Sequence, residues 1–201
     1  MTALASYKGV TPAEGLGIIG FDIGLVVTGT TLEHANFWQA AAGGSKFSGT
    51  LALPKIQVHK GLPFNFDLGA FVASTPGSNI RLIGGEIRYG IIGGNLAFPA
   101  VALRVSRTEL TGVDQLDFET TGLDVSLSKG LLMLTPYAGL GKVWSNSDPK
   151  GAVAAVYAGE SLSMSKFFAG ANLNLGLLNF ALELDKTGDA SSASLKVGFR
   201  F

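Results

Sequence analysis

Cysteine is absent from the 201 residues, and histidine occurs only at His34 and His59. The lack of thiols excludes a disulfide framework, thiolate zinc sites and cysteine nucleophiles. Two histidines at distant positions give a poor basis for a metal site or for acid–base catalysis. We therefore expect neither a metal nor a cofactor.

Charged residues are also sparse. They make up 15% of the chain, whereas an average soluble chain contains about 25%. The 15 basic and 15 acidic residues cancel, so no net charge attracts nucleic acid. A long apolar run is missing too: the best candidate, "LGIIGFDIGLVV", is interrupted by Asp22 and is shorter than the ~20 residues of a membrane-spanning helix.

Glycine, in contrast, is abundant. Its 28 residues are spread along the chain and form no low-complexity linker. None of them lies between an expected strand and an expected helix, as a phosphate-binding loop requires. We expect them to relieve crowding inside a narrow barrel and to permit strong coiling of its strands.

From residue 16 onward the chain alternates between apolar and polar residues with a period of two, which is typical of strands that separate two environments. In the first run, Ile23, Leu25 and Val27 lie opposite Asp22 and Gly24. The faces of the run within 131–145 are left open. Ten such runs are expected: 19–27, 51–60, 64–72, 83–91, 101–106, 123–127, 133–144, 166–175, 179–185 and 194–201.

The connections between these runs alternate between long and short, as in an antiparallel meander with its long loops at one end. The sequence therefore predicts an all-β fold, a closed antiparallel up-and-down transmembrane β-barrel of about ten strands. We assign residues 16–201 to the barrel and residues 1–15 to an N-terminal extension. An even number of strands returns both termini to the same side.

The polar face carries charges of both signs on nearly every strand. The favoured interpretation is an ion-pair network that fills the lumen, because eight to ten strands leave room for little beyond side chains. The alternative is a narrow polar conduit. Phe71 and Phe168 also point inward, which suits partial occlusion. The lumen network comprises Asp22, Lys55, Asp67, Glu86, Arg88, Arg104, Asp124, Lys166, Glu183, Asp185, Lys196 and Arg200.

The closing run, "SLKVGFRF", has apolar residues at every second position and ends on Phe201. It resembles the last strand of bacterial outer-membrane β-barrels, in which a terminal aromatic belongs to the signal read by the assembly machinery. The resemblance implies that Phe199 and Phe201 form such a signal, and that the protein lies in outer-membrane lipid. Residues 1–15 lack the features of a secretory signal peptide. We expect that such a signal has been removed from this chain.

An enzyme is not expected. Membrane-embedded proteases of the omptin type use an Asp-x-His dyad, and no Asp-x-His occurs here. His34 falls in the first long connection, and His59 falls on the polar face next to a tight turn at the opposite end. In the same long connection, Phe37 and Trp38 are expected to form a lid over the mouth or to lie at the lipid interface.

These observations predict an outer-membrane barrel of structural or narrow-channel type, with a small molecule or an ion as permeant. A first alternative is a transporter for small hydrophobic ligands, with a pocket formed by the first long connection and "AVAAVYAG" (residues 152–159). A second is a soluble lipocalin-like binder, for which the charged interior is a poor fit.

Overall fold

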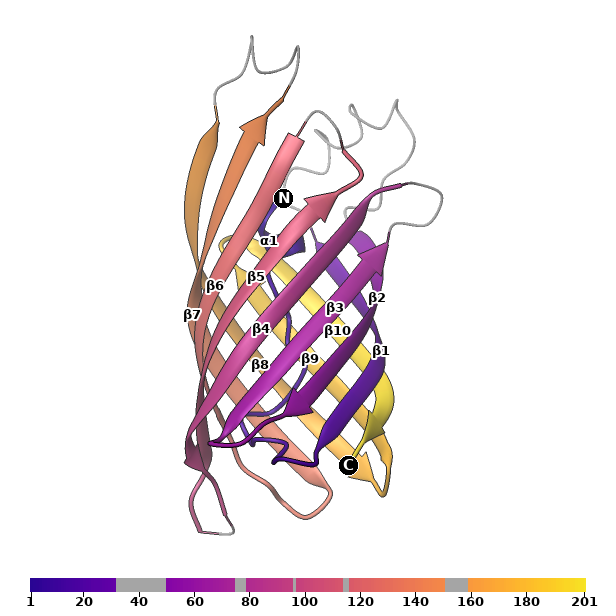
Figure 1. The fold of residues 1–201 in the computed structure, drawn as a ribbon, viewed down its shortest axis with the longest axis vertical. Helices are drawn as coiled ribbons and strands as arrows, with labels where there is room; N and C mark the ends of the chain where they lie inside the picture. The colour runs from indigo at the N-terminus through magenta and orange to yellow at the C-terminus, as the bar shows by residue number, and fades with distance from the viewer. Residues whose placement is uncertain (32–49, 75–78, 96, 114–115, 151–158) are drawn as a thin grey trace.

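The structure is a computed structural model that describes residues 1–31, 50–74, 79–95, 97–113, 116–150 and 159–201. It is a barrel of ten tilted strands with one short helix near the N-terminus (Figure 1). The elements are α1 (Thr2–Ala5), β1 (Phe21–Thr31), β2 (Thr50–Gly61), β3 (Phe66–Ser74), β4 (Arg81–Gly93), β5 (Ala100–Thr111), β6 (Leu116–Ser128), β7 (Leu134–Pro149), β8 (Glu160–Leu175), β9 (Leu178–Thr187) and β10 (Ala190–Arg200).

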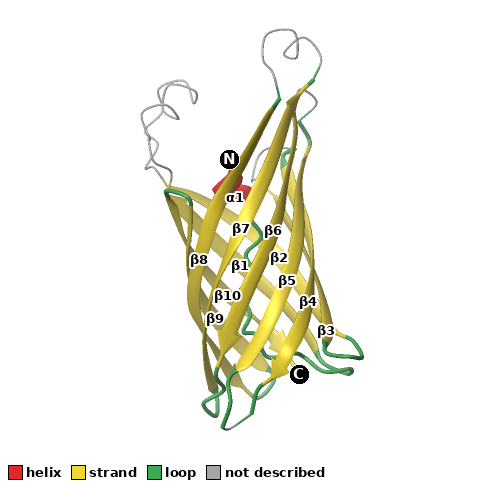
Figure 2. Cartoon of the chain, turned by 90° about the vertical axis from the view of Figure 1, so that its left-hand side faces the viewer, coloured by secondary structure: helices red, strands yellow, loops and turns green. Residues whose placement is uncertain are grey.

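Every strand is antiparallel to its two neighbours, and the sheet closes where β1 pairs with β10 from Asp22↔Arg200 to Thr31↔Ser191. Closure satisfies the backbone groups that an open edge would leave exposed to lipid. The predicted fold class, a closed antiparallel barrel of ten strands, is confirmed (Figure 2).

The barrel has two distinct ends. At one end, here called the loop mouth, β1, β3, β5, β7 and β9 finish; the longest connections, 32–49 and 150–159, join strands there. At the other end, the turn mouth, the connections are 62–65, 94–99, 129–133 and 176–177. In barrels of this kind the longer loops are extracellular and the short turns are periplasmic.

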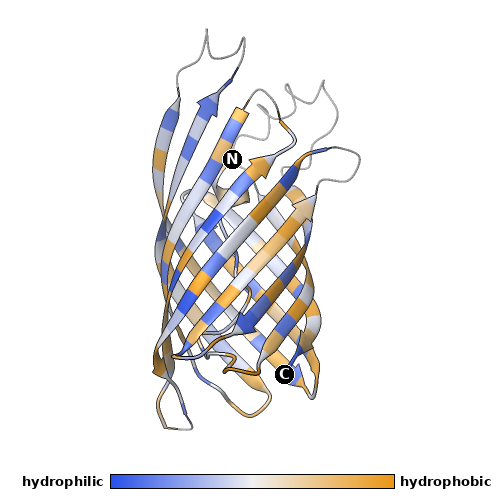
Figure 3. Ribbon diagram, in the orientation of Figure 1, coloured by the Kyte–Doolittle hydropathy of each residue, from blue (hydrophilic) through white to orange (hydrophobic). Residues whose placement is uncertain are grey.

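The outer surface is a band of apolar side chains. Along β1, Ile23, Leu25 and Val27 are exposed, with Leu25 at 66%, while the residues between them are buried. Figure 3 shows the same alternation of hydrophilic and hydrophobic positions along other strands. Aromatic pairs lie on this surface at the turn mouth, Phe66 with Tyr89 and Phe21 with Phe201, as in the aromatic girdle of a membrane barrel.

Near the loop mouth the outward positions become polar. Arg107 forms ion pairs with Glu109 (2.9 Å) and Glu119 on the outside of β5 and β6. The expected runs 101–106 and 133–144 therefore end too early, because β5 continues to Thr111 and β7 to Pro149. Above the apolar band the outward positions are polar, so the apolar-out alternation that revealed the strands stops before the strands do.

Two further details differ from the expected runs. The third strand begins at Phe66, because Phe64 lies in the preceding turn with a φ of 62°. The first begins at Phe21. The faces of β7, which the sequence left open, are now assigned: Tyr137 and Val143 are buried inside the barrel, and Leu140 is exposed outside.

Glycines opposite aromatic rings make room in the lumen. Phe71 is the register partner of Gly84, and Phe168 is the register partner of Gly139. A Cβ atom on either glycine would overlap the opposing ring. The inward orientation predicted for Phe71 and Phe168 is confirmed, since both are buried, and two of the many glycines are explained by it.

The N-terminal segment runs through the lumen. The chain starts at the loop mouth with α1, descends inside the barrel and reaches β1 at the turn mouth, where the C-terminus lies (Figure 1). The expectation that both termini lie on one side is therefore wrong. The expectation of a lumen with room for little beyond side chains is wrong as well, because this one also holds a stretch of main chain.

Candidate functional site: the lumen and its N-terminal segment

Residues 2–13, here called the plug segment, are buried except for the half-buried Leu4. Tyr7 is 2% exposed and Val10 is fully buried. Only residues 2–5 are helical, and the rest of the segment forms no regular structure. Its backbone polar groups therefore lack helical partners and need others, because a buried unpaired group is costly.

The barrel wall supplies donors for the plug segment's carbonyl groups. Three wall cations and one amide donate hydrogen bonds to consecutive parts of the segment, so that it is held along its length. The bonds run from Lys166 to the carbonyl of Tyr7 (2.5 Å), from Lys55 to Lys8 (2.6 Å), from Gln57 to Gly9 (2.8 Å) and from Arg88 to Pro12 (2.6 Å).

Wall carboxylates supply the complementary acceptors. The backbone N–H of Val10 donates to Glu183 at 3.2 Å, and the ammonium of Lys8 lies 3.5 Å from Asp185. Just past the plug segment, the N–H of Leu16 donates to Asp67 at 3.1 Å. The inward charges of the wall thus bind the segment as well as one another.

The ion pairs within the wall are arranged along one rung of the sheet. Asp67, Arg88, Arg104 and Asp124 are successive register partners across β3, β4, β5 and β6. Arg88 binds Asp67 at 2.7 Å, and Arg104 binds Asp124 at 2.7 Å. Arg104 also lies 3.4 Å from Glu86. The two bonds of 2.7 Å have the length of strong charge-assisted hydrogen bonds.

A second group of charges lies nearer the seam. Lys196 lies 2.5 Å from Asp22, and Arg200 lies 3.8 Å from the same carboxylate. Lys166 on β8 instead extends the first group, since it lies 3.3 Å from Asp124. All twelve residues of the expected lumen network lie on inward positions, and eleven are buried, Arg200 being the partly exposed one. Their role in function stays a prediction.

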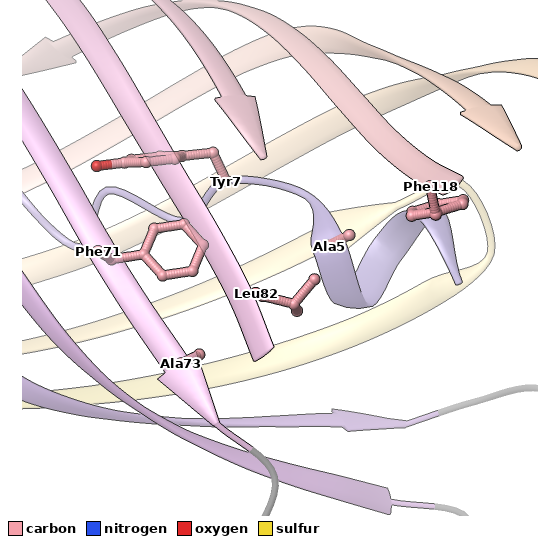
Figure 4. Close-up of a cluster of buried hydrophobic side chains, with 6 residues drawn as sticks. All are labelled: Ala5, Tyr7, Phe71, Ala73, Leu82 and Phe118. Carbon is pink, nitrogen blue, oxygen red and sulfur yellow. The ribbon is translucent and has the colours of Figure 1, made fainter. Parts of the chain in front are cut away.

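Aromatic contacts fix the upper part of the plug segment. Tyr7 packs edge-on against Phe71 with ring centroids 5.2 Å apart, and Ala5 belongs to the same buried cluster (Figure 4). The ammonium of Lys55 lies 4.9 Å from the Phe71 ring centroid. Gly9 is required by close approach, since a Cβ there would overlap the guanidinium of Arg104.

Sequence reasoning left residues 1–15 without a role. The stretch "TALASYKGVTPA" has no period of two or of 3.6 and few large apolar residues, so nothing in it predicts burial. The one feature consistent with burial is that Lys8 is its sole charged residue, while the strands that follow carry several inward cations able to donate hydrogen bonds to it.

His59 is embedded in the wall of the lumen. Its Nε2 lies 3.2 Å from the Gln57 amide and 3.4 Å from Glu86. No group of three or more metal-ligating His, Asp or Glu residues occurs in the part of the chain that the structure describes. His34, Phe37 and Trp38 lie outside the described residues, as does most of 152–159.

No helix among the described residues is long and apolar enough to span a membrane.

The expected assembly signal lies at the seam. Phe199 and Phe201 are exposed on the outer surface. Phe201 exchanges two backbone hydrogen bonds with Phe21, of 2.9 and 3.0 Å. The last residue therefore pairs with the first residue of β1 at the turn mouth, where the barrel closes.

A closed antiparallel barrel with an apolar exterior, aromatic residues at its edge and a polar interior is a transmembrane β-barrel. The same features distinguish it from a soluble barrel, which turns its apolar face inward.

Known proteins resemble the chain in fold. No family model and no curated protein matches its sequence. Among solved structures, the translocator domain of autotransporter NalP from Neisseria meningitidis has a TM-score of 0.48 and 13% identity, over 92% of this chain and 89% of that one. The KdgM porin, in complex with disordered oligogalacturonate, has a TM-score of 0.42 and 8% identity, over 89% of this chain and 99% of that one. The outer-membrane protease OmpT from Escherichia coli has a TM-score of 0.41 and 10% identity, over 90% of this chain and 95% of that one.

The prediction of a bacterial outer-membrane β-barrel is confirmed at the level of the fold. A closed ten-stranded barrel with this exterior belongs in the outer membrane of a Gram-negative bacterium. A barrel fold alone does not define a function, which has to be argued from the lumen of this chain.

Proposed function

We propose that the protein is a narrow outer-membrane channel that is closed at rest by its own plug segment. The observation that carries this proposal is the burial of residues 2–13 inside the lumen, where wall side chains bind the segment's backbone. A permanently filled structural barrel could use apolar packing alone. This segment is instead held largely by charged side chains, which water can solvate once the segment leaves.

The wall suits small polar permeants. With the plug segment displaced, the inward side chains of Lys55, Lys166, Glu183 and Asp185 would line the vacated space, which would carry charges of both signs. Such a wall favours ions or small polar molecules without strong selectivity for one sign.

We propose no catalytic activity. His59 is the one histidine among the described residues, and its ring is buried and packed between Gln57 and Glu86. The partners we propose are outer-membrane lipid and, through Phe199 and Phe201, the barrel assembly machinery. A soluble binder would expose the apolar outer band to water, which argues against the lipocalin-like alternative.

A disulfide lock tests the channel. The hydroxyl oxygens of Thr2 and Ser145 are 2.8 Å apart, so Thr2→Cys with Ser145→Cys brings two sulfur atoms within reach of an S–S bond of about 2 Å. The lock would fix the plug segment to β7. The native chain has no cysteine to interfere.

The matched control joins two wall strands without touching the plug segment. Thr28 and Ser194 are register partners whose hydroxyl oxygens are also 2.8 Å apart, which gives Thr28→Cys with Ser194→Cys. In planar bilayers we expect the plug lock to be silent when oxidised and to show small conductance steps after reduction. The control should conduct in both states. Absence of conductance from every variant would overturn the channel, and equal conductance of the oxidised and reduced lock would overturn the plug.

A further inference from the structure

The lumen changes character beneath the loop mouth. On β2, β4, β5 and β6, the inward positions there carry Leu53, Leu82, Leu110 and Phe118, which pack together in one apolar cluster. On β1 and β10, which follow β2 around the barrel, the inward positions near the same mouth are polar: Thr30 is hydrogen-bonded to Ser192. One side of the mouth is therefore apolar and the other polar.

Neither lipid nor water accounts for the apolar side. These leucines point into the barrel, away from the membrane, and water alone would favour polar residues, as on β1 and β10. Part of the explanation is the plug segment, because Ala5 is buried in the same cluster (Figure 4). The segment does not fill the space, however. A cavity of about 220 Å³ is left between Met1 and Leu4 on one side and the leucines on the other.

An apolar cavity of this kind can hold a ligand. A cavity of roughly 150 Å³ lined by aliphatic and aromatic side chains stays dry and takes up benzene. We propose that the cavity at the loop mouth binds a small uncharged apolar molecule, of the size class of a monoaromatic or a short aliphatic compound. The described lining residues offer no charged side chain, which favours an uncharged ligand.

Ligand binding is linked to the plug segment, and this link rests on the proposed channel function. Met1, Leu4 and Ala5 form one wall of the cavity, so displacement of the segment dismantles the site. A ligand that binds only the closed form stabilises it by mass action. Binding of the apolar molecule therefore keeps the channel closed, and opening of the channel releases the molecule.

Methyl NMR of the full chain in lipid nanodiscs tests the site, with toluene as the probe. Leu53→Met introduces a labelled methyl group into the cavity. Met164 lies on β8 outside the lining, and Met133 is exposed at the turn mouth, so Met133 reports toluene that merely enters the bilayer. We expect saturable shifts of the introduced signal and of Met1, which also lines the cavity, and no saturable shift of Met133 or Met164.

Two variants that fill the cavity from opposite walls complete the test: Leu110→Trp from β5 and Ala5→Leu from the plug segment. Each should abolish the saturable shift, and heat-modifiable migration on gels identifies whichever one folds. A shift that grows linearly with toluene, in parallel with Met133, would overturn the site. So would a saturable shift that survives in a folded filling variant.

Conductance tests the link separately. Toluene should lower the frequency of conductance steps of the reduced Thr2→Cys/Ser145→Cys channel at least several-fold, and it should have no effect once Ala5→Leu or Leu110→Trp fills the cavity. Saturable binding with unchanged step frequency would overturn the link. A complete lack of conductance at any toluene concentration would overturn the channel itself, while the NMR result still decides the site.

Discussion

Arg88 and Arg104 are direct register partners on β4 and β5, yet each binds a carboxylate on the strand to its other side. Arg88 binds Asp67 on β3, and Arg104 binds Asp124 on β6. Two arginines thus occupy the centre of a four-residue rung with one carboxylate at each end. Arg88 also donates to the plug segment at Pro12, so wall and plug share this residue.

Arg88→Leu should destabilise the barrel strongly. It leaves Asp67 buried without its ion-pair partner, and breaking such a pair costs about 3–5 kcal/mol. Unfolding in denaturant, followed by gel migration, measures the loss. Arg107→Leu is the matched control, because Arg107 lies on the same sheet in an exposed ion pair outside the barrel and its loss should not measurably change stability. Equal stability of both variants would indicate a water-filled lumen.

Gly9→Ala should loosen the plug segment. A Cβ at Gly9 would overlap the guanidinium of Arg104, which is already held by Asp124 and Glu86. We expect more frequent conductance steps than in the native protein. Gly15→Ala is the control, because a Cβ there would lie 3.7 Å from Asp67, an ordinary contact. A native-like recording from Gly9→Ala would argue that the segment does not occupy this site.

Deletion of Phe201 should impair assembly in cells far more than the stability of a barrel refolded in detergent. The side chain is 63% exposed, so it retains only part of the ~1.5–3 kcal/mol of a fully buried one. Membrane fractionation and denaturant unfolding give the two measurements. Phe64→Ala, at an exposed turn residue of the same mouth, should affect neither. Normal insertion of the deletion variant would refute the assembly signal.

The two termini should lie on opposite sides of the membrane. A short epitope placed before Met1 should be detected on intact cells, because the chain begins at the loop mouth. Leu132→Cys, at a fully exposed residue of a turn-mouth connection, should react with a membrane-impermeant maleimide only after the cells are permeabilised. An epitope detected only after permeabilisation would contradict the path of the N-terminal segment.

The strands were predictable because the outward positions contact lipid and are therefore apolar. Ile23, Leu25 and Val27 alternate with Asp22 and Gly24, and membrane and lumen impose that alternation directly. The phase of β7 was not predictable, since alanine and glycine occupy consecutive positions at 138 and 139 and fit either face.

The plug segment could not be predicted for a different reason. Its burial is decided by residues far away in the chain, such as Lys55, Lys166 and Glu183, which form hydrogen bonds with its main chain. Backbone recognition leaves almost no trace in the sequence of the bound segment. Gly9 is such a trace, because a Cβ there would overlap the guanidinium of Arg104, but this cannot be inferred without knowing that Arg104 lies beside it.

The central claim is that the plug segment occupies the lumen of the folded barrel. Disulfide formation in Thr2→Cys/Ser145→Cys, measured by mass spectrometry on protein assembled in membranes, tests it most directly. The account predicts that the two thiols form an internal disulfide as completely as those of Thr28→Cys/Ser194→Cys. Two free thiols that both react with maleimide, while the control pair is fully crosslinked, would contradict it.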